Sequence, residues 1–211
     1  VQVKNISSSA IELNFHYFLP AVQSDLNAAY KVFGNGDIIV TTELEIGEGE
    51  LPEIPRFGLR MQIPVEYNNV KWYGRGPHEN YCDRKTSAFV GVYKSTVEDL
   101  YVPYISPQEN GTRTDIRWAA LSDDEGSGLL LSGMDLLSLS ALRYTIEDLT
   151  QKSRGTKHTI DLKERDLIEV CVDLKQMGVG GDNSWGARPH PQYTLLPQNY
   201  VFSFRLSPLK N

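Results

Sequence analysis

The chain has 211 residues, of which 40% are hydrophobic and 23% charged, with a formal net charge of −6 and a pI near 5.3. This composition is typical of a soluble globular protein and excludes a disordered chain. Basic residues are scattered singly, so nucleic acid is not an expected partner, and no run approaches the ~18 apolar residues that a membrane span requires. We expect a single domain over residues 1–211 in a soluble protein, of the cytoplasm or the periplasm.

Short runs of alternating apolar and polar residues follow one another along the chain. In residues 37–46, Ile38, Val40 and Leu44 fall on one face of an extended strand, and Asp37 and Glu43 fall on the other. This is the pattern of a strand with one buried face. Similar runs predict strands at residues 1–6, 11–18, 28–33, 37–46, 56–63, 65–72, 88–93, 114–121, 128–132, 136–142, 167–174 and 200–206.

Two local elements can be predicted in more detail. Asn35 and Gly36 predict a hairpin over residues 28–46 with a type I′ turn, in which both central residues have positive φ. The one predicted helix is a turn or two at residues 145–150, where Thr145 is the N-cap and Asp148 replaces the Glu or Gln of a capping box. A dozen short strands with one small helix predict an all-β sandwich of large antiparallel sheets.

Residues 72–84, Trp-Tyr-Gly-Arg-Gly-Pro-His-Glu-Asn-Tyr-Cys-Asp-Arg, combine aromatic, glycine and charged residues too closely for a strand or a helix. They predict an ordered loop, and residues 101–113 have the same character. Since both charge signs are nearly balanced, we favour a structural network over the alternative, part of a polar cleft wall. The expected members of this network are Arg75, His78, Glu79, Asn80, Asp83 and Arg84.

Isolated chemical groups in the chain do not indicate a catalytic or metal site. Glu79 and Asp83 are disfavoured as a glycosidase acid/base pair, because nearby arginines keep carboxylates ionised whereas a general acid needs a raised pKa. Cys82 and Cys171 lie far apart, with no CxxC pair and no histidines at ligand spacing. Neither a zinc site nor a disulfide framework is therefore predicted.

Residues 177–185, Met-Gly-Val-Gly-Gly-Asp-Asn-Ser-Trp, place a large aromatic side chain at the end of a glycine-rich loop. Trp185 would present a flat apolar face to a sugar ring. The alternative is that Trp185 folds back as a plug on its own core. The residues expected to shape or orient the loop are Gly180, Gly181, Asp182, Asn183, Ser184 and, on a rigid segment between two prolines, His190.

Three motifs, at residues 72–84, at residues 104–111 and at residues 177–185, together resemble the C-terminal domain of large bacterial β-galactosidases of glycoside hydrolase family 2. The resemblance extends from about residue 51 to residue 206. It implies a galactose-mutarotase-like supersandwich, which agrees with the strands predicted from alternation.

The resemblance also implies that catalysis and the lining of the substrate site are divided between different domains. In the family, the catalytic glutamates and the magnesium and sodium sites belong to a TIM barrel that these residues do not include, so the segment itself is expected to carry no catalytic residue and no cofactor. Trp185 is the position that matches the family's substrate-lining tryptophan. The expected partners are the other domains of the same polypeptide, a β-galactoside and, in the parent protein, further copies of itself.

The sequence departs from the family pattern in two places. The family's domain usually begins upstream of Val1, so the first strands of the sandwich are expected to be missing and the open edge to favour self-association. Residues 186–191 follow a variable part of the family, which leaves the preference among galactosides open.

Two other functions are alternatives to the β-galactosidase domain. One is a stand-alone carbohydrate-binding module. The other is a mutarotase-type epimerase, which needs a histidine and a carboxylate in one cleft.

Overall fold

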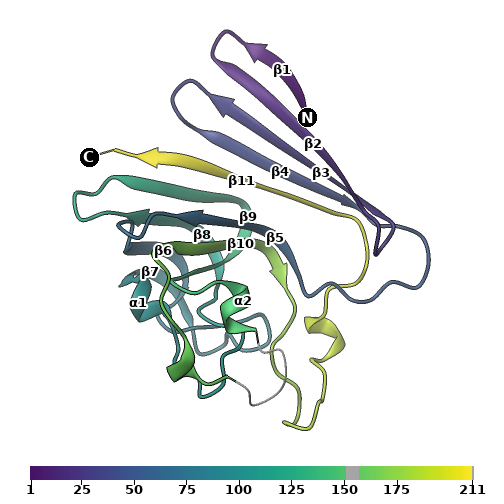
Figure 1. Ribbon diagram of the computed structural model, residues 1–211, viewed down its shortest axis with the longest axis vertical. Helices are drawn as coiled ribbons and strands as arrows, with labels where there is room; N and C mark the ends of the chain where they lie inside the picture. Colours follow the sequence, from purple (N-terminus) through teal and green to yellow (C-terminus); the bar gives the residue numbers. More distant parts are fainter. Residues whose placement is uncertain (151–156, 211) are drawn as a thin grey trace.

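The computed structural model describes residues 1–150 and 157–210, and most of its regular structure is β-sheet (Figure 1). The strands are β1 (Gln2–Ser7), β2 (Ala10–Leu19), β3 (Ser24–Phe33), β4 (Ile38–Glu45), β5 (Arg56–Ile63), β6 (Asn69–Gly76), β7 (Phe89–Thr96), β8 (Arg113–Ser122), β9 (Gly128–Leu142), β10 (Ile168–Gln176) and β11 (Tyr200–Leu209). The helices are the short α1 (Val97–Leu100) and α2 (Ile146–Leu149) and the 3₁₀ turns η1 (Thr159–Asp161) and η2 (Pro191–Tyr193). The predicted all-β class is confirmed.

Strand β9 connects the two parts of the sheet. The strand order is β1-β2-β3-β4-β11-β9-β8-β6-β7, with β10 paired to both β9 and β5, and the pairings are antiparallel. One part of β9 pairs with β11 and a later part pairs with β10. Although β5 and β11 are not paired, the rings of Phe57 and Tyr200 on these strands pack with centroids 5.5 Å apart. The sheet therefore folds over itself, and its facing parts form the predicted sandwich.

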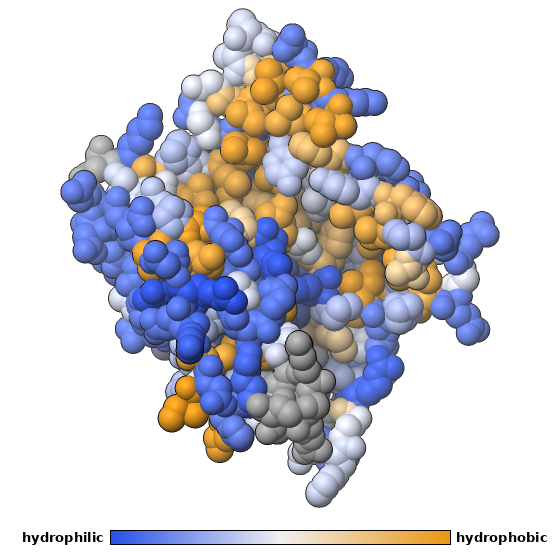
Figure 2. All heavy atoms as spheres, viewed as in Figure 1, coloured by the Kyte–Doolittle hydropathy of each residue, from blue (hydrophilic) through white to orange (hydrophobic). Residues whose placement is uncertain are grey.

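The hydrophobic core lies between these facing parts. Most of its largest fully buried side chains come from β4, β6, β8, β9, β10 and β11, among them Val40, Trp72, Ile116, Leu131, Ile168, Phe202 and Phe204. Burial of one such side chain is worth about 1.5–3 kcal/mol. In contrast, β1 is exposed at every residue. Figure 2 shows apolar side chains gathered on the upper part of the molecule, where Figure 1 places β1 and β2.

The hairpin predicted over residues 28–46 is present as β3 and β4, but the predicted type I′ turn is wrong. The Gly36 amide donates to the Phe33 carbonyl at 2.9 Å, and Gly36 has φ +91° while Asn35 is not left-handed. The Asn35 side chain instead accepts from the Asp37 amide at 3.1 Å. This is a three-residue loop, a type I turn followed by a left-handed glycine. Gly34 supplies the additional residue that a two-residue turn lacks.

The stretch predicted as a loop over residues 72–84 begins as a strand. β6 starts four residues later than the strand predicted at residues 65–72 and continues to pair with β7 as far as Gly76. A Cβ atom on Gly74 would lie 2.4 Å from Ile116 Cδ1, and one on Gly76 would lie 2.9 Å from the Tyr93 ring. These glycines allow side chains to pack closely against the strand rather than breaking it. The loop itself begins at Pro77 and continues beyond residue 84 to the start of β7 at Phe89.

The strands predicted at residues 128–132 and 136–142 form one continuous strand, β9. Its register with β8 is irregular, since Ile116 pairs with Leu137 but Trp118 pairs with Ser132. The additional residues of β9 form a bulge between its β11-paired and β10-paired parts. A bulge bends a strand, which explains how β9 serves both parts of the sheet.

The predicted helix at residues 145–150 is confirmed as α2, with its capping box. The Asp148 amide donates to Thr145 Oγ1 at 3.2 Å, and the Thr145 amide donates to Asp148 Oδ2 at 2.9 Å. The sequence analysis missed α1, where the Asp99 amide donates to Thr96 Oγ1 at 3.3 Å. The same Thr-x-x-Asp spacing marks both helices and is the signal that would have identified α1.

Candidate functional site

The glycine-rich loop follows β10 and presents its tryptophan to solvent. The Trp185 side chain is 88% exposed, so it is not a plug in the core of this chain. Its backbone amide donates to Asn183 Oδ1 at 2.8 Å, which closes a turn of the kind expected from Asn183. Ser184, between them, is also exposed. An exposed indole on an ordered turn is able to stack against the apolar face of a ring.

Contacts along its length fix the path of this loop. His190 Nε2 lies 2.8 Å from Asp182 Oδ1, so His190 contacts the loop that it was predicted to orient. A Cβ atom on Gly181 would lie 2.1 Å from the Ala187 carbonyl oxygen, so only glycine allows the backbone to pass there. The Gly180 amide donates to Asp83 Oδ2 at 2.8 Å, which ties the loop to residues 77–84.

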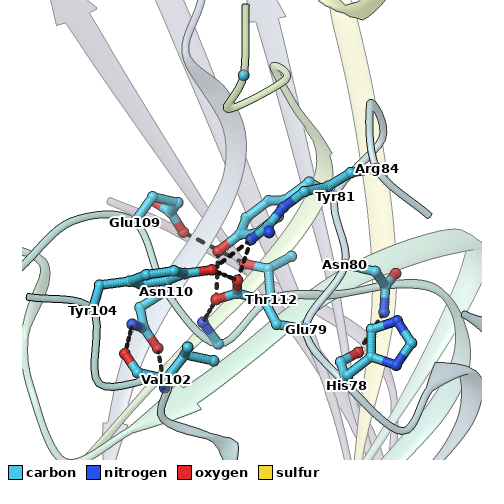
Figure 3. A network of polar contacts seen from close by, with 12 residues as sticks. His78, Glu79, Asn80, Tyr81, Arg84, Val102, Tyr104, Glu109, Asn110 and Thr112 are labelled. Atoms are coloured by element: carbon cyan, nitrogen blue, oxygen red, sulfur yellow. Dashed lines mark hydrogen bonds and ion pairs between the residues drawn. The ribbon is translucent and has the colours of Figure 1, made fainter. Parts of the chain in front are cut away.

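Glu79 is the centre of a buried network that joins two loops (Figure 3). Its Oε1 accepts from Tyr104 Oη at 2.6 Å and pairs with Arg84. Its Oε2 accepts from the Gly111 amide at 2.7 Å and from Tyr81 Oη at 3.2 Å. Burial, followed by the charge of Glu79, raises the pKa of Tyr81 well above its usual range, so this hydroxyl remains a donor. The carboxylate is saturated with donors, which is a structural arrangement rather than that of a general acid.

Two buried asparagines reinforce the same region. Asn80 Oδ1 accepts from the Thr114 amide at 3.0 Å and from Thr114 Oγ1 at 2.6 Å, at the start of β8. Asn110 bonds both backbone groups of Val102, with Nδ2 donating to the carbonyl at 2.6 Å and Oδ1 accepting from the amide at 2.9 Å. Both side chains replace backbone partners that a loop cannot supply. The two loops are therefore ordered by side chains.

The other residues predicted to share one network lie in separate clusters. Arg75 contacts Asp115 at 2.5 Å and donates to the Ala88 carbonyl at 2.8 Å. His78 lies on the exposed side, with Nε2 3.1 Å from Ser87 Oγ. Asp115, which the sequence analysis did not single out, has φ +54° and sits between Arg75 and Lys85. Burial by itself would raise the pKa of Asp115, but the hydrogen bonds and charges of these two cations together outweigh it and lower the pKa.

A cleft of about 670 Å³ lies between the Glu79 network and the glycine-rich loop. Arg84 and Tyr104 line it, and so do residues 177–180 of the glycine-rich loop. Arg56 and Glu109 also line it, with Arg56 Nη2 3.3 Å from Glu109 Oε1. Polar groups of both signs thus line a cleft beside the glycine-rich loop. Arg84 forms part of its wall, which supports the interpretation of residues 72–84 as contributing to a cleft wall as well as to the network.

Arg56 also makes a buried ion pair with Asp173 on β10. Arg56 Nη2 lies 3.0 Å from Asp173 Oδ2. Burial raises the pKa of Asp173 to about 7, against the opposing effect of Arg56. The sequence analysis missed this pair. The signal was available, because Asp173 interrupts the apolar run of β10 and a charged residue in a buried strand requires a partner.

The chemistry of the described residues is limited. In residues 1–150 and 157–210, no group of three or more His, Cys, Asp or Glu side chains is placed to hold a metal ion. No helix in this part of the chain is long and apolar enough to cross a membrane. Cys82 and Cys171 are free thiols, and burial raises the pKa of Cys171 to about 11.

The chain is similar to known proteins both in sequence and in structure. The family model described as "Beta galactosidase small chain" matches residues 1–206. The chain is 40% identical to a β-galactosidase of Priestia megaterium over 85% of this chain and 17% of that protein, and 33% identical to one of Streptococcus thermophilus over 97% and 20%. It is structurally similar to a putative aldose 1-epimerase of Escherichia coli K12, with a TM-score of 0.45, 9% identity and coverage of 98% and 67%. The chain thus spans about a fifth of the curated relatives that it matches.

Proposed function

The chain belongs to the β-galactosidase small-chain family, and on that premise we propose that it is the C-terminal part of a retaining β-galactosidase, an enzyme that removes terminal β-D-galactose from β-galactosides. Its role is to shape the substrate site. The acid/base and nucleophile glutamates, and the family's magnesium and sodium ions, would be held by other domains of the same polypeptide. The parent is proposed to be a homo-oligomer, which the exposed edge strand β1 supports.

The observation that carries this proposal is the position of Trp185. The indole is 88% exposed on a loop whose Gly180 amide is bonded to Asp83 and whose Asp182 side chain contacts His190. Exposure of an apolar side chain of this size to water is unfavourable. The indole can instead cover the apolar C–H face of a galactoside ring. We therefore assign Trp185 to stacking on the sugar or the aglycone at the mouth of the active site.

The test is the kinetics of Trp185→Ala in the full-length parent enzyme. Loss of a desolvated stacking contact is expected to raise KM for a β-galactoside by more than about tenfold. Trp185→Phe keeps an aromatic face and is expected to retain part of the affinity. Phe89→Ala is the control, because Phe89 is also strongly exposed but lies on the edge strand β7. Unchanged KM in Trp185→Ala contradicts the assignment.

The 670 Å³ cleft beside the loop favours a second candidate, a stand-alone carbohydrate-binding module. Titration of galactose or lactose into the chain by itself separates the two, because a module binds sugar measurably and a detached domain binds hardly at all. A mutarotase-type epimerase is less well supported. The described residues that line the cleft include Glu109 but no histidine, and an assay of anomer interconversion by polarimetry is expected to be negative.

A further inference from the structure

We propose that Asp83 is a positioning residue for Trp185: its carboxylate anchors the glycine-rich loop and so sets where the indole meets the substrate. This inference rests on the proposed function of Trp185 and extends it to a residue outside the loop. It is carried by contacts between two segments that lie nearly a hundred positions apart in the sequence.

The carboxylate of Asp83 contacts the loop at two glycines, Gly178 and Gly180. Oδ2 accepts a hydrogen bond from the Gly180 amide at 2.8 Å. Gly178 packs directly against the same group, since a Cβ atom there would lie 2.7 Å from Oδ2 and 2.8 Å from Cγ. A hydrogen bond to an ionised acceptor is stronger than one between neutral groups. Asp83 therefore holds the loop at its glycines, where the backbone is most flexible.

Asp83 is itself attached to a rigid part of the fold. Its neighbour Arg84 pairs with the buried Glu79, and the Arg84 amide donates to the Tyr81 carbonyl at 3.0 Å. On the other side, Cys82 Sγ donates to the Gln176 carbonyl at 3.3 Å, at the end of β10. The position of the Asp83 carboxylate is thus defined by the core, and the loop is the part that would move if the contact were lost.

The contacts beyond Gly180 transmit this position to the tryptophan. The Gly181 backbone passes directly against Ala187, and Asp182 is in contact with His190. Asn183 then closes the turn that carries Trp185. A loop with three glycines samples many conformations when it is not fixed, and the substrate would have to order it on binding. Loss of the Asp83 contact should therefore weaken substrate binding without altering the chemical step.

The experiment is a double-mutant cycle on KM and kcat for a β-galactoside, made in the full-length parent enzyme. Asp83→Ala is expected to raise KM about fivefold with kcat nearly unchanged. The double variant Asp83→Ala/Trp185→Ala is expected to match Trp185→Ala alone, because the residue acts through the tryptophan. Asp83→Asn, which keeps an oxygen acceptor for Gly180, is expected to restore most of the affinity.

Asp123→Ala is the matched control. Asp123 Oδ1 also accepts from backbone amides, those of Glu125 and Ser127, each at 2.9 Å, but it lies in the turn between β8 and β9. The KM of Asp123→Ala should equal that of the unaltered enzyme. If Asp83→Ala does not fold, Gly178→Ala disturbs the same contact from the loop side and should give the same rise in KM.

The outcomes separate the inference from the proposed function. Unchanged KM in Trp185→Ala overturns the proposed function and the inference with it. A raised KM in Trp185→Ala together with an unchanged KM in Asp83→Ala overturns the inference alone. So does a double variant in which the two effects multiply, because the aspartate would then act independently of the tryptophan.

Discussion

Replacing Glu79 by glutamine tests whether its network orders the loops beside the cleft. The substitution keeps size and shape but exchanges one carboxylate oxygen for an NH₂ group. If that group replaces Oε2, it faces the Gly111 amide, whose N–H cannot rotate away. If it replaces Oε1, it faces the Arg84 guanidinium. In either orientation a donor is left facing a donor.

The expected loss follows from these contacts. Breaking a fully buried ion pair costs about 3–5 kcal/mol, but Arg84 is half-exposed and water can solvate it. We therefore expect Glu79→Gln to lower the free energy of unfolding by about 2–4 kcal/mol. For a chain of this size, at about 3 °C of Tm per kcal/mol, this corresponds to a decrease in Tm of about 6–12 °C.

Differential scanning calorimetry measures this decrease directly. Glu125→Gln is the matched control, because Glu125 lies exposed in the turn between β8 and β9; its Tm should change by less than about 1 °C. If Glu79→Gln unfolds at the same temperature as the control, the carboxylate does not stabilise the two loops, and the argument from saturated donors is wrong.

Two further predictions concern β5, β6 and β10. Because burial raises the pKa of Asp173 to about 7 against the opposing effect of Arg56, the proton it binds in the folded state stabilises the fold. That stability is complete below the unfolded pKa near 4 and is lost as pH rises through about 7. In urea titrations the free energy of unfolding should therefore fall by about 1 kcal/mol between pH 6 and pH 8. If the free energy of unfolding of Asp173→Asn falls by the same amount, the pH dependence comes from another group. Gly74→Ala should cost about 1–3 kcal/mol in the same assay, because its Cβ would lie 2.4 Å from Ile116. Gly34→Ala, whose Cβ would be 3.5 Å from its nearest neighbour, should cost much less, and equal losses would show that close packing is not the cause.

The sequence predicted the strands well, because alternation records which face of a strand is buried. The run from Ile38 to Leu44 marks β4 clearly, and Thr145 with Asp148 marks α2. Alternation does not record what lies opposite a residue. Gly74 therefore resembled a loop former, although in the structure it leaves room for Ile116 on the neighbouring strand.

The site was less predictable for the same reason. The loop with Trp185 could be identified from its glycines, and Tyr104 and Glu109 from the motif around them. The partnership of Arg56 with Asp173, and that of Asp83 with Gly180, depends on pairings between distant segments. Local patterns contain no information on such pairings, since any of several charged residues would satisfy a buried aspartate equally well.

The central position of β11 has a consequence for how the chain folds. Among the strands that the structure describes, the first four form a meander of local hairpins, and this meander joins the rest of the sheet through β11. The hydrogen bond between Thr41 and Ser203 spans 162 positions of sequence. Pairings of such long range are slow to form, because the entropy of loop closure must be lost before the contact is made. During synthesis, the early hairpins would therefore wait with an unpaired β4 edge until β11 had been made, and that interval is when a chaperone or a second nascent chain could bind them.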